Sequence, residues 1–163
     1  QFWFDKDEYD IPVYEHVMRT YRFITALMRR GVVKAAYALD STGLMAGISK
    51  MAFGNQLGVA IEDALKAVEL FENCLGDLVI EVSAQNGAKL LGRNHSEVEG
   101  LHFRKVAVVR EDKLFTWHEV RISMEEALAA WKSSLVKVFP TKADKSAAPG
   151  ETRLYRADEI YVC

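Results

Sequence analysis

The stretch that decides the fold is KAAYALDSTGLMAGISKMAFGNQLGVAIE, residues 34–62. Residues 32–39 are apolar and rich in small side chains, which is typical of a short buried strand. The polar run 40–42 then precedes Gly43 and offers the N-cap chemistry with which a helix begins. The sequence therefore predicts a strand followed directly by a helix that ends near Phe53.

The inward side of that helix is predicted from its spacing to be Leu44, Ile48 and Met51. Glycines bracket a turn at 54–58, and a second strand is predicted over residues 59–62. On the N-terminal side, apolar residues recur at helical spacing over 11–30, so another helix should precede the deciding stretch.

The remainder of the chain alternates further helix and strand patterns. Asp63 is expected to cap a third helix, after which residues 78–82 alternate as a half-buried strand. Asn86-Gly87 indicates a turn, with a returning strand over 89–91. Residues 104–122 are predicted to form one hairpin.

A capping box at Ser123 to Glu126 predicts a further amphipathic helix, and residues 141–152 have the composition of a linker. The fold class expected is α+β, a layered mixed β-sheet of about five to seven strands flanked by helices. We place a main domain at 1–122, and a helix and linker at 123–163.

Composition narrows the classes of function. The 163 residues carry 21 basic and 23 acidic side chains, and a net charge of -2 gives no broad surface for nucleic acid or anionic membrane. No apolar run approaches the roughly 20 residues of a membrane span, and the start lacks a signal peptide, so a cytoplasmic setting is expected. Because the chain begins without Met and ends on the β-prone run EIYVC, we expect it to be a piece of a longer polypeptide.

Metal and nucleophile chemistry is not predicted. The cysteines, Cys74 and Cys163, form no CxxC pair, and the four histidines have no ligand spacing. No P-loop or GxGxxG is present. We therefore assign no catalytic residue and no metal ligand within this chain.

The polar turn before the second helix is the candidate site. Helix amides and the positive end of the helix dipole meet there, which suits a phosphate or another anion. Ser41 and Thr42 can donate hydroxyls, Gly43 allows close approach, and Asp40 can cap the helix, accept from a ribose hydroxyl or hold Mg²⁺ through water. The more common role for such a turn is simply a capped helix start.

Residues 34–62 also resemble a known family, the aminoimidazole-ribonucleotide-synthetase-type C-terminal half-domain of phosphoribosylformylglycinamidine synthases. The family pattern is His-Asp-x-Ser-Asp-Gly-Gly-Leu, then Glu-Met, then a Gly-x-x-Gly-Val-like turn. This sequence keeps the register at Leu44, at Lys50-Met51 and over residues 54–59. At the centre it departs, with Tyr37-Ala38 for His-Asp and Asp40-Ser41-Thr42-Gly43 for Ser-Asp-Gly-Gly.

Two further segments, ELFENCLGDLVIEV (69–82) and AWKSSLVKVFPTK (130–142), resemble the same family. The resemblance implies a nucleotide or substrate-phosphate site at residues 40–43. It also implies a full enzyme that uses ATP, Mg²⁺ and glutamine to amidate formylglycinamide ribonucleotide. The partners implied are an N-terminal half-domain and a glutamine amidotransferase domain of the same polypeptide, and the isolated piece is expected to be inactive and to hold no cofactor tightly.

Two alternatives stay open. The chain can be a non-catalytic structural half-domain that lines an auxiliary cleft. It can also be the equivalent domain of a selenophosphate synthetase, a hydrogenase-maturation protein or a thiamine-phosphate kinase, although the segment at 130–142 argues against this second alternative.

Overall fold

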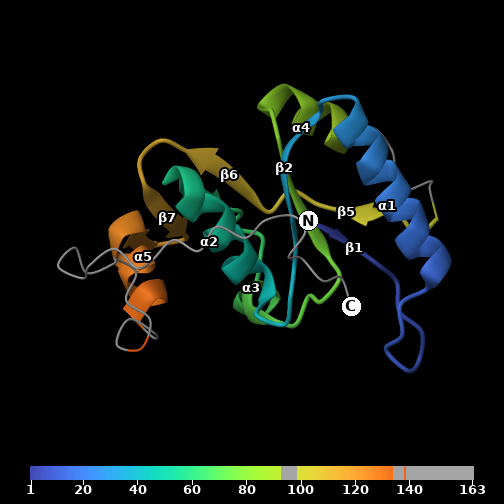
Figure 1. Cartoon of the computed structure of the whole chain (residues 1–163), viewed down its shortest axis with the longest axis horizontal. Coiled ribbons are helices and arrows are strands. Elements are labelled where there is room, and N and C mark those ends of the chain that lie inside the picture. The colour runs from blue at the N-terminus through green and yellow to red at the C-terminus, as the bar shows by residue number, and fades with distance from the viewer. Residues whose placement is uncertain (93–98, 134–137, 139–163) are drawn as a thin grey trace, which may run out of the picture. The chain divides into compact units, whose positions relative to one another are not determined.

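The computed structural model describes residues 1–92, 99–133 and 138 (Figure 1). The chain divides into two compact units, residues 1–128 and 129–163, and almost everything described lies in the first. Helices and two β-sheets make up this first unit, which confirms the expected α+β class. The strands form two four-stranded sheets where one sheet of five to seven strands was expected.

The first sheet is wholly antiparallel and has the order β2-β4-β1-β5. Its strands are β1 (Phe2–Trp3), β2 (Val33–Ala38), β4 (Leu78–Val82) and β5 (His102–Phe103). Strand β2 lies at the edge of this sheet and most of its side chains are exposed, so the prediction of a buried strand was wrong for it. Burial begins at Leu39, immediately after the strand.

Helix α1 (Tyr14–Arg29) buries Ile24 and Leu27, whereas Tyr21 and Met28, which share the predicted apolar spacing with Ile24, are exposed. Ile24 is buried together with Phe2 and Leu101, and the partly buried Ile80 of β4 packs against them. Gly31, with φ +67°, follows the end of the helix as predicted. The helix predicted over 11–30 is thus confirmed.

The second sheet has the order β6-β3-β7-β8 and is mixed, because β3 runs parallel to β7. Its strands are β3 (Gly58–Ile61), β6 (Ala107–Arg110), β7 (Leu114–Trp117) and β8 (Val120–Ser123). The single hairpin predicted over 104–122 is wrong, because β3 lies between β6 and β7. Val59 and Ile61 are only 4% and 5% exposed, so their burial favours a central place for β3.

The larger core cluster lies around helix α2 (Gly43–Asn55) and the short helix α3 (Ala67–Phe71). Leu44 is fully buried, and Ile48 lies beside it, as the spacing predicted. Asp63 does not cap α3, because that helix begins four residues later, where the Lys66 amide donates to Glu69 Oε2 at 2.8 Å.

Residues 84–92 form helix α4 (Ala84–Gly92), so the turn at Asn86-Gly87 and the strand over 89–91 were predicted wrongly. The Ser83 hydroxyl accepts from the Asn86 amide at 3.3 Å, and the Gly87 amide donates to the Ser83 carbonyl at 2.8 Å. A Ser-capped helix start therefore overrides the local turn preference.

Helix α5 (Met124–Ser133) begins at the predicted cap, where Ser123 Oγ accepts from the Glu126 amide at 3.1 Å. The linker at 141–152 lies outside the described residues, and the extents 1–122 and 123–163 remain predictions. Within the part of the chain that is described, no helix combines the length and apolar character that crossing a bilayer requires.

Candidate functional site

The predicted site, residues 40–43, forms the turn between β2 and α2. Asp40 Oδ1 accepts from the Thr42 amide at 2.8 Å and from the Thr42 hydroxyl. The Gly43 amide donates to the Asp40 carbonyl at 3.2 Å. Thr42 holds the N-cap position, but its side chain makes no capping bond to the helix. The side chain of Asp40 therefore satisfies donors at the start of α2.

A lysine two helical turns further along reaches the same carboxylate. Lys50 Nζ lies 3.0 Å from Asp40 Oδ2, and it also lies 5.6 Å from the centre of the Tyr37 ring. In the sequence, Lys50 indicates only the register of the family pattern. Its spacing of seven residues from Gly43, which places both on one helix face, is the signal that could have identified it.

The electrostatics of the turn follow from these contacts. The Thr42 hydroxyl and amide, with Lys50, lower the pKa of Asp40 to about 2. Asp40, followed by Tyr37, raises the pKa of Lys50. An ionised carboxylate thus lies at the positive end of the α2 dipole, where an external anion was predicted to bind.

Gly43 has a packing role that the sequence did not reveal. Its φ is +88°, and a Cβ built on it would lie 2.8 Å from the Glu72 carbonyl oxygen and 3.0 Å from that of Leu70. The backbone at the end of α3 therefore fills the space that was predicted to admit a ligand. Ser41, in contrast, is exposed and remains open to solvent.

Two histidines that are far apart in the sequence meet one carboxylate. His102 Nε2 and His16 Nδ1 each lie 2.8 Å from Asp5 Oδ2. The hydrogen bond from His102, with a smaller contribution from His16, lowers the pKa of Asp5. No group of three or more His, Cys, Asp or Glu side chains within the described ranges is arranged to hold a metal ion.

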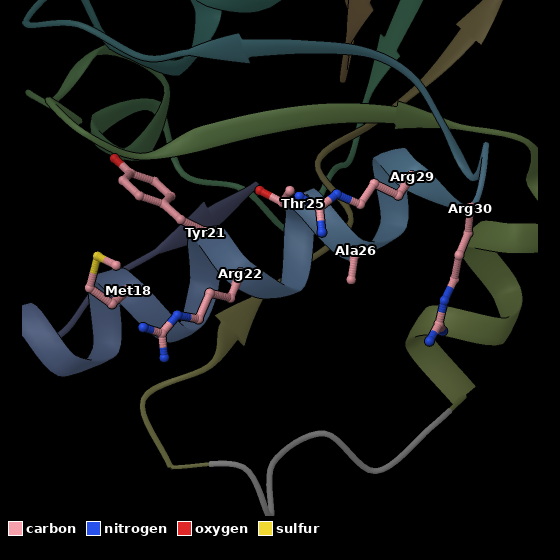
Figure 2. Close-up of a pocket in the computed structure, with 7 residues that line it drawn as sticks. All are labelled: Met18, Tyr21, Arg22, Thr25, Ala26, Arg29 and Arg30. Atoms are coloured by element: carbon pink, nitrogen blue, oxygen red, sulfur yellow. The ribbon is translucent and has the colours of Figure 1, made fainter.

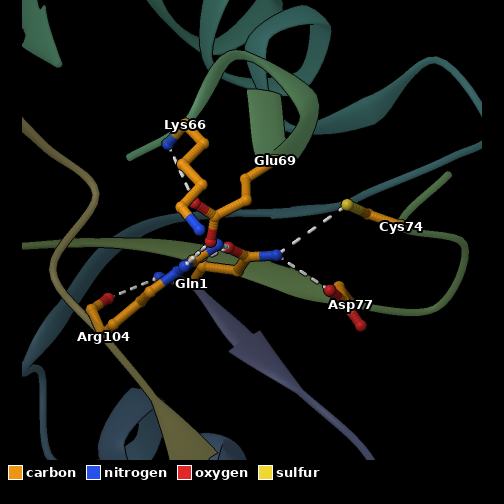
Figure 3. A network of polar contacts seen from close by, with 6 residues as sticks. All are labelled: Gln1, Lys66, Glu69, Cys74, Asp77 and Arg104. Carbon is orange, nitrogen blue, oxygen red and sulfur yellow. Dashed lines mark hydrogen bonds and ion pairs between the residues drawn. The ribbon is translucent and has the colours of Figure 1, made fainter. Parts of the chain in front are cut away.

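A second polar network ties α3 to the first sheet (Figure 3). Arg104 pairs with Glu69 of α3 and donates to Gln1 Oε1 from Nε at 3.2 Å and from Nη2 at 3.0 Å. Gln1 Nε2 in turn donates to Asp77 Oδ2 at 2.9 Å. The arrangement links segments separated by up to 103 residues, and its role is structural.

Burial changes the acidity of two members of this network region. It raises the pKa of the Asp77 carboxyl and of the Cys74 thiol. Cys74 is a free cysteine with 6% of its surface exposed, which fits an unreactive core thiol. Cys163 and His95 lie outside the described residues.

Comparison with known proteins supports the expected fold. No protein-family model matches the sequence. Phosphoribosylformylglycinamidine synthase II from Thermotoga maritima superimposes on 86% of this chain and 24% of its own, with 15% identity and a TM-score of 0.54. T. maritima PurL complexed with AMPPCP matches 99% of this chain and 29% of its own, with 15% identity and a TM-score of 0.57.

PurL from the same organism complexed with FGAR also matches, with 15% identity and a TM-score of 0.54 over 86% of this chain and 23% of its own. The chain thus has the fold of these synthases, and the resemblance seen in the sequence is confirmed at the level of the fold. It spans about a quarter of their length.

Proposed function

We propose that this chain is part of a phosphoribosylformylglycinamidine synthase and forms one wall of a nucleotide or substrate cleft. The observation that carries the proposal is the fold match over 86% of the chain, joined to the motif register at residues 34–62. The full enzyme would be a cytoplasmic ligase of purine biosynthesis. ATP would activate the formamide oxygen of the ribonucleotide, and ammonia from glutamine would displace the resulting phosphate.

Within that enzyme, ATP and Mg²⁺ are held mainly by other domains. The oxygens of Asp40 already accept from Thr42 and Lys50, and the ammonium of Lys50 repels a cation. This residue is therefore a poor magnesium ligand. The N-terminal half-domain and the glutamine amidotransferase domain of the same polypeptide are the proposed partners.

For residues 40–43, the first candidate role is contact with the phosphate of the ribonucleotide. The hydroxyls of Ser41 and Thr42, the helix amides and the Lys50 ammonium are donors of the required kind. Direct contact requires that the Asp40 carboxylate first move away, because it accepts from the Thr42 amide, the Thr42 hydroxyl and the Lys50 ammonium and carries the charge of an anion itself.

The second candidate role is structural, as a half-domain that lines an auxiliary cleft. One observation favours it: Asp40 Oδ1 accepts from the Thr42 amide at 2.8 Å and Asp40 Oδ2 lies 3.0 Å from Lys50 Nζ, so an internal anion takes the place of the external one. Where the family pattern has a neutral serine followed by aspartate, this chain has the carboxylate one residue earlier, at Asp40, where it accepts from Thr42 and Lys50. The geometry of the turn favours this structural role over phosphate contact.

Exchange of Asp40 for the serine of the family pattern tests the two roles in the 163-residue chain. The binding of inorganic phosphate and of formylglycinamide ribonucleotide would be followed by calorimetry. If the site is closed by Asp40, the wild-type chain binds each ligand at least tenfold more weakly than Asp40→Ser does, a difference of at least about 1.4 kcal/mol.

Asp7→Ser is the matched control, because Asp7 also accepts from backbone amides in a turn, at 2.9 Å from Tyr9 and Ile11. Tight phosphate binding by the wild-type chain would contradict the structural role. In the full-length polypeptide, Ser41→Ala adds a kinetic test. Unchanged kinetics support the auxiliary cleft, whereas a raised KM for the ribonucleotide supports phosphate contact.

A further inference from the structure

The outer face of α1 carries an open surface cavity of about 490 Å³ (Figure 2). Its lining includes Met18, Tyr21, Arg22, Thr25, Arg29 and Arg30. These side chains come from α1 and its C-cap residue Arg30 and recur at three- and four-residue spacing, so they form a continuous stripe. The stripe lies away from the buried face of Ile24 and Leu27, and the role proposed for residues 40–43 does not use it.

One end of this stripe is apolar and fixed in place. Met18 is 48% exposed and Tyr21 is 39% exposed. The Tyr21 ring meets Phe4 edge-on with centroids 5.6 Å apart, and its hydroxyl donates to the Gly76 carbonyl at 3.4 Å. A ring held in this way presents apolar surface without a further loss of side-chain freedom on binding.

The other part of the stripe is basic. Arg22, Arg29 and Arg30 are exposed, and among residues 1–92, 99–133 and 138 none of the three has an ion-pair partner. Among the residues that the structure describes, no acidic side chain lines the cavity, although the whole chain has a net charge of -2. The positive charge is therefore local to this face.

Simpler roles explain only part of the pattern. Arg29 lies in the last turn and Arg30 follows it, so both complement the helix dipole, but Arg22 lies in the middle of the helix, where that effect has faded. A second copy of the chain docked on this face about a two-fold axis would bring like charges together. Three charges on a chain that is acidic overall are also few for nucleic acid.

We propose that this face of α1 docks an acidic peptide segment. The basic charge of the face favours an acidic partner, and the spacing of the arginines predicts the spacing of the carboxylates in that partner. Arg22 and Arg29 are seven residues apart, which is about 10 Å along a helix. In a polyproline II segment, which has three residues per turn and rises about 3.1 Å per residue, carboxylates three residues apart lie on the same side and span about 9 Å, close to that distance. Met18 precedes Arg22 by about 6 Å along the helix. Two residues of the peptide cover about the same distance, so an apolar side chain two residues before the first carboxylate lies near Met18 and Tyr21.

The probe is a fluorescein-labelled hexapeptide with leucine at its first position, glutamates at its third and sixth, and serines elsewhere. The fluorescence anisotropy of this peptide is measured as the 163-residue chain is added. The peptide should bind saturably at low salt, and binding should be lost at about 1 M salt, where the Debye length is about 3 Å. Arg22→Gln and Arg29→Gln should each weaken binding roughly twofold to fivefold. Arg121→Gln is the matched control, because Arg121 is exposed on β8, and it should have no effect.

Met18→Ala tests the apolar contact. It should weaken binding of the leucine peptide but not of a peptide with serine in that position. If Arg22→Gln proves unfolded by circular dichroism, exchanging both glutamates of the peptide for glutamine gives the same readout on the wild-type chain. The proposal would be overturned if Arg121→Gln weakened peptide binding as much as Arg22→Gln does, or if replacing the leucine of the peptide did not change its affinity. Equally tight binding of a single-stranded oligonucleotide would also overturn it.

Discussion

Gly43→Ala is the substitution that best separates a packing role from a ligand role at the predicted site. An alanine held at a φ of +88° bears a left-handed strain of about 1–2 kcal/mol. Its Cβ would also press on the carbonyl oxygens of Leu70 and Glu72, at 3.0 and 2.8 Å. Overpacking of this kind costs about 1–3 kcal/mol, and backbone atoms yield less readily than the end of a side chain.

These two terms add to about 2–5 kcal/mol. The lower entropy of alanine in the unfolded chain offsets roughly 0.4–1 kcal/mol of that loss. Urea unfolding followed by tryptophan fluorescence should therefore show a lower midpoint with an unchanged slope. In a thermal scan, each kcal/mol corresponds to about 2–4 °C for a chain of this size.

Gly54→Ala is the matched control, because Gly54 lies in the same helix with no atom within 4 Å of a built Cβ. It should stabilise the protein by about 0.5–1 kcal/mol, as expected for removing a helical glycine. If Gly43→Ala were as stable as the wild type, the close approach of α3 to α2 would not constrain this position. A role in ligand approach would then be the better explanation for the glycine.

Three further substitutions test the core, a helix end and a partly buried acid. Leu44→Ala removes a fully buried side chain and should cost about 2–5 kcal/mol in urea unfolding, and a smaller loss would mean that the site collapses around the cavity. Gln56→Gly should stabilise by about 1 kcal/mol, because Gln56 ends α2 with a φ of 52°, and a loss of stability would point to an unseen side-chain contact. Burial raises the pKa of Asp77, so the folded state binds its proton more tightly, and its contribution to stability falls as pH rises from the ordinary Asp pKa through the folded value. Asp77→Asn should therefore be more stable than the wild type at neutral pH and equal to it in acid, and a difference that does not vary with pH would contradict this account.

Local sequence pattern predicted much of the fold. The apolar spacing of α1 and α2 and the Ser123 cap of α5 could be identified from the sequence because each depends on residues within about two helical turns. The pairing of the strands could not be identified in this way. The turn residues at 110–113 favour a hairpin, but Gly58 to Ile61 pair with residues 107–110 across nearly 50 positions of sequence.

The same distinction holds at the candidate site. Residues 40–43 were found because turn chemistry is local, and Lys50 lies within reach of the same periodicity argument. The contact of Gly43 with the end of α3 and the meeting of His16 and His102 at Asp5 depend on tertiary approach. No spacing rule indicates them.

This chain has the charged Asp40 where the family pattern has a neutral serine, and this difference affects whether the turn can bind an anion. A serine at this position could still accept from the Thr42 amide, but it carries no charge to balance the Lys50 ammonium, and a site with such an unbalanced charge gains stability by binding an anion. Asp40 supplies that anion within the chain, at 2.8 Å from the amide and 3.0 Å from the ammonium. Because the charge of the turn is balanced internally, the framework around Leu44 does not require a ligand to be stable. An external phosphate would have to displace a carboxylate whose pKa is lowered to about 2. The hydrogen bonds from Thr42 and Lys50 that hold this carboxylate in place would therefore oppose phosphate binding.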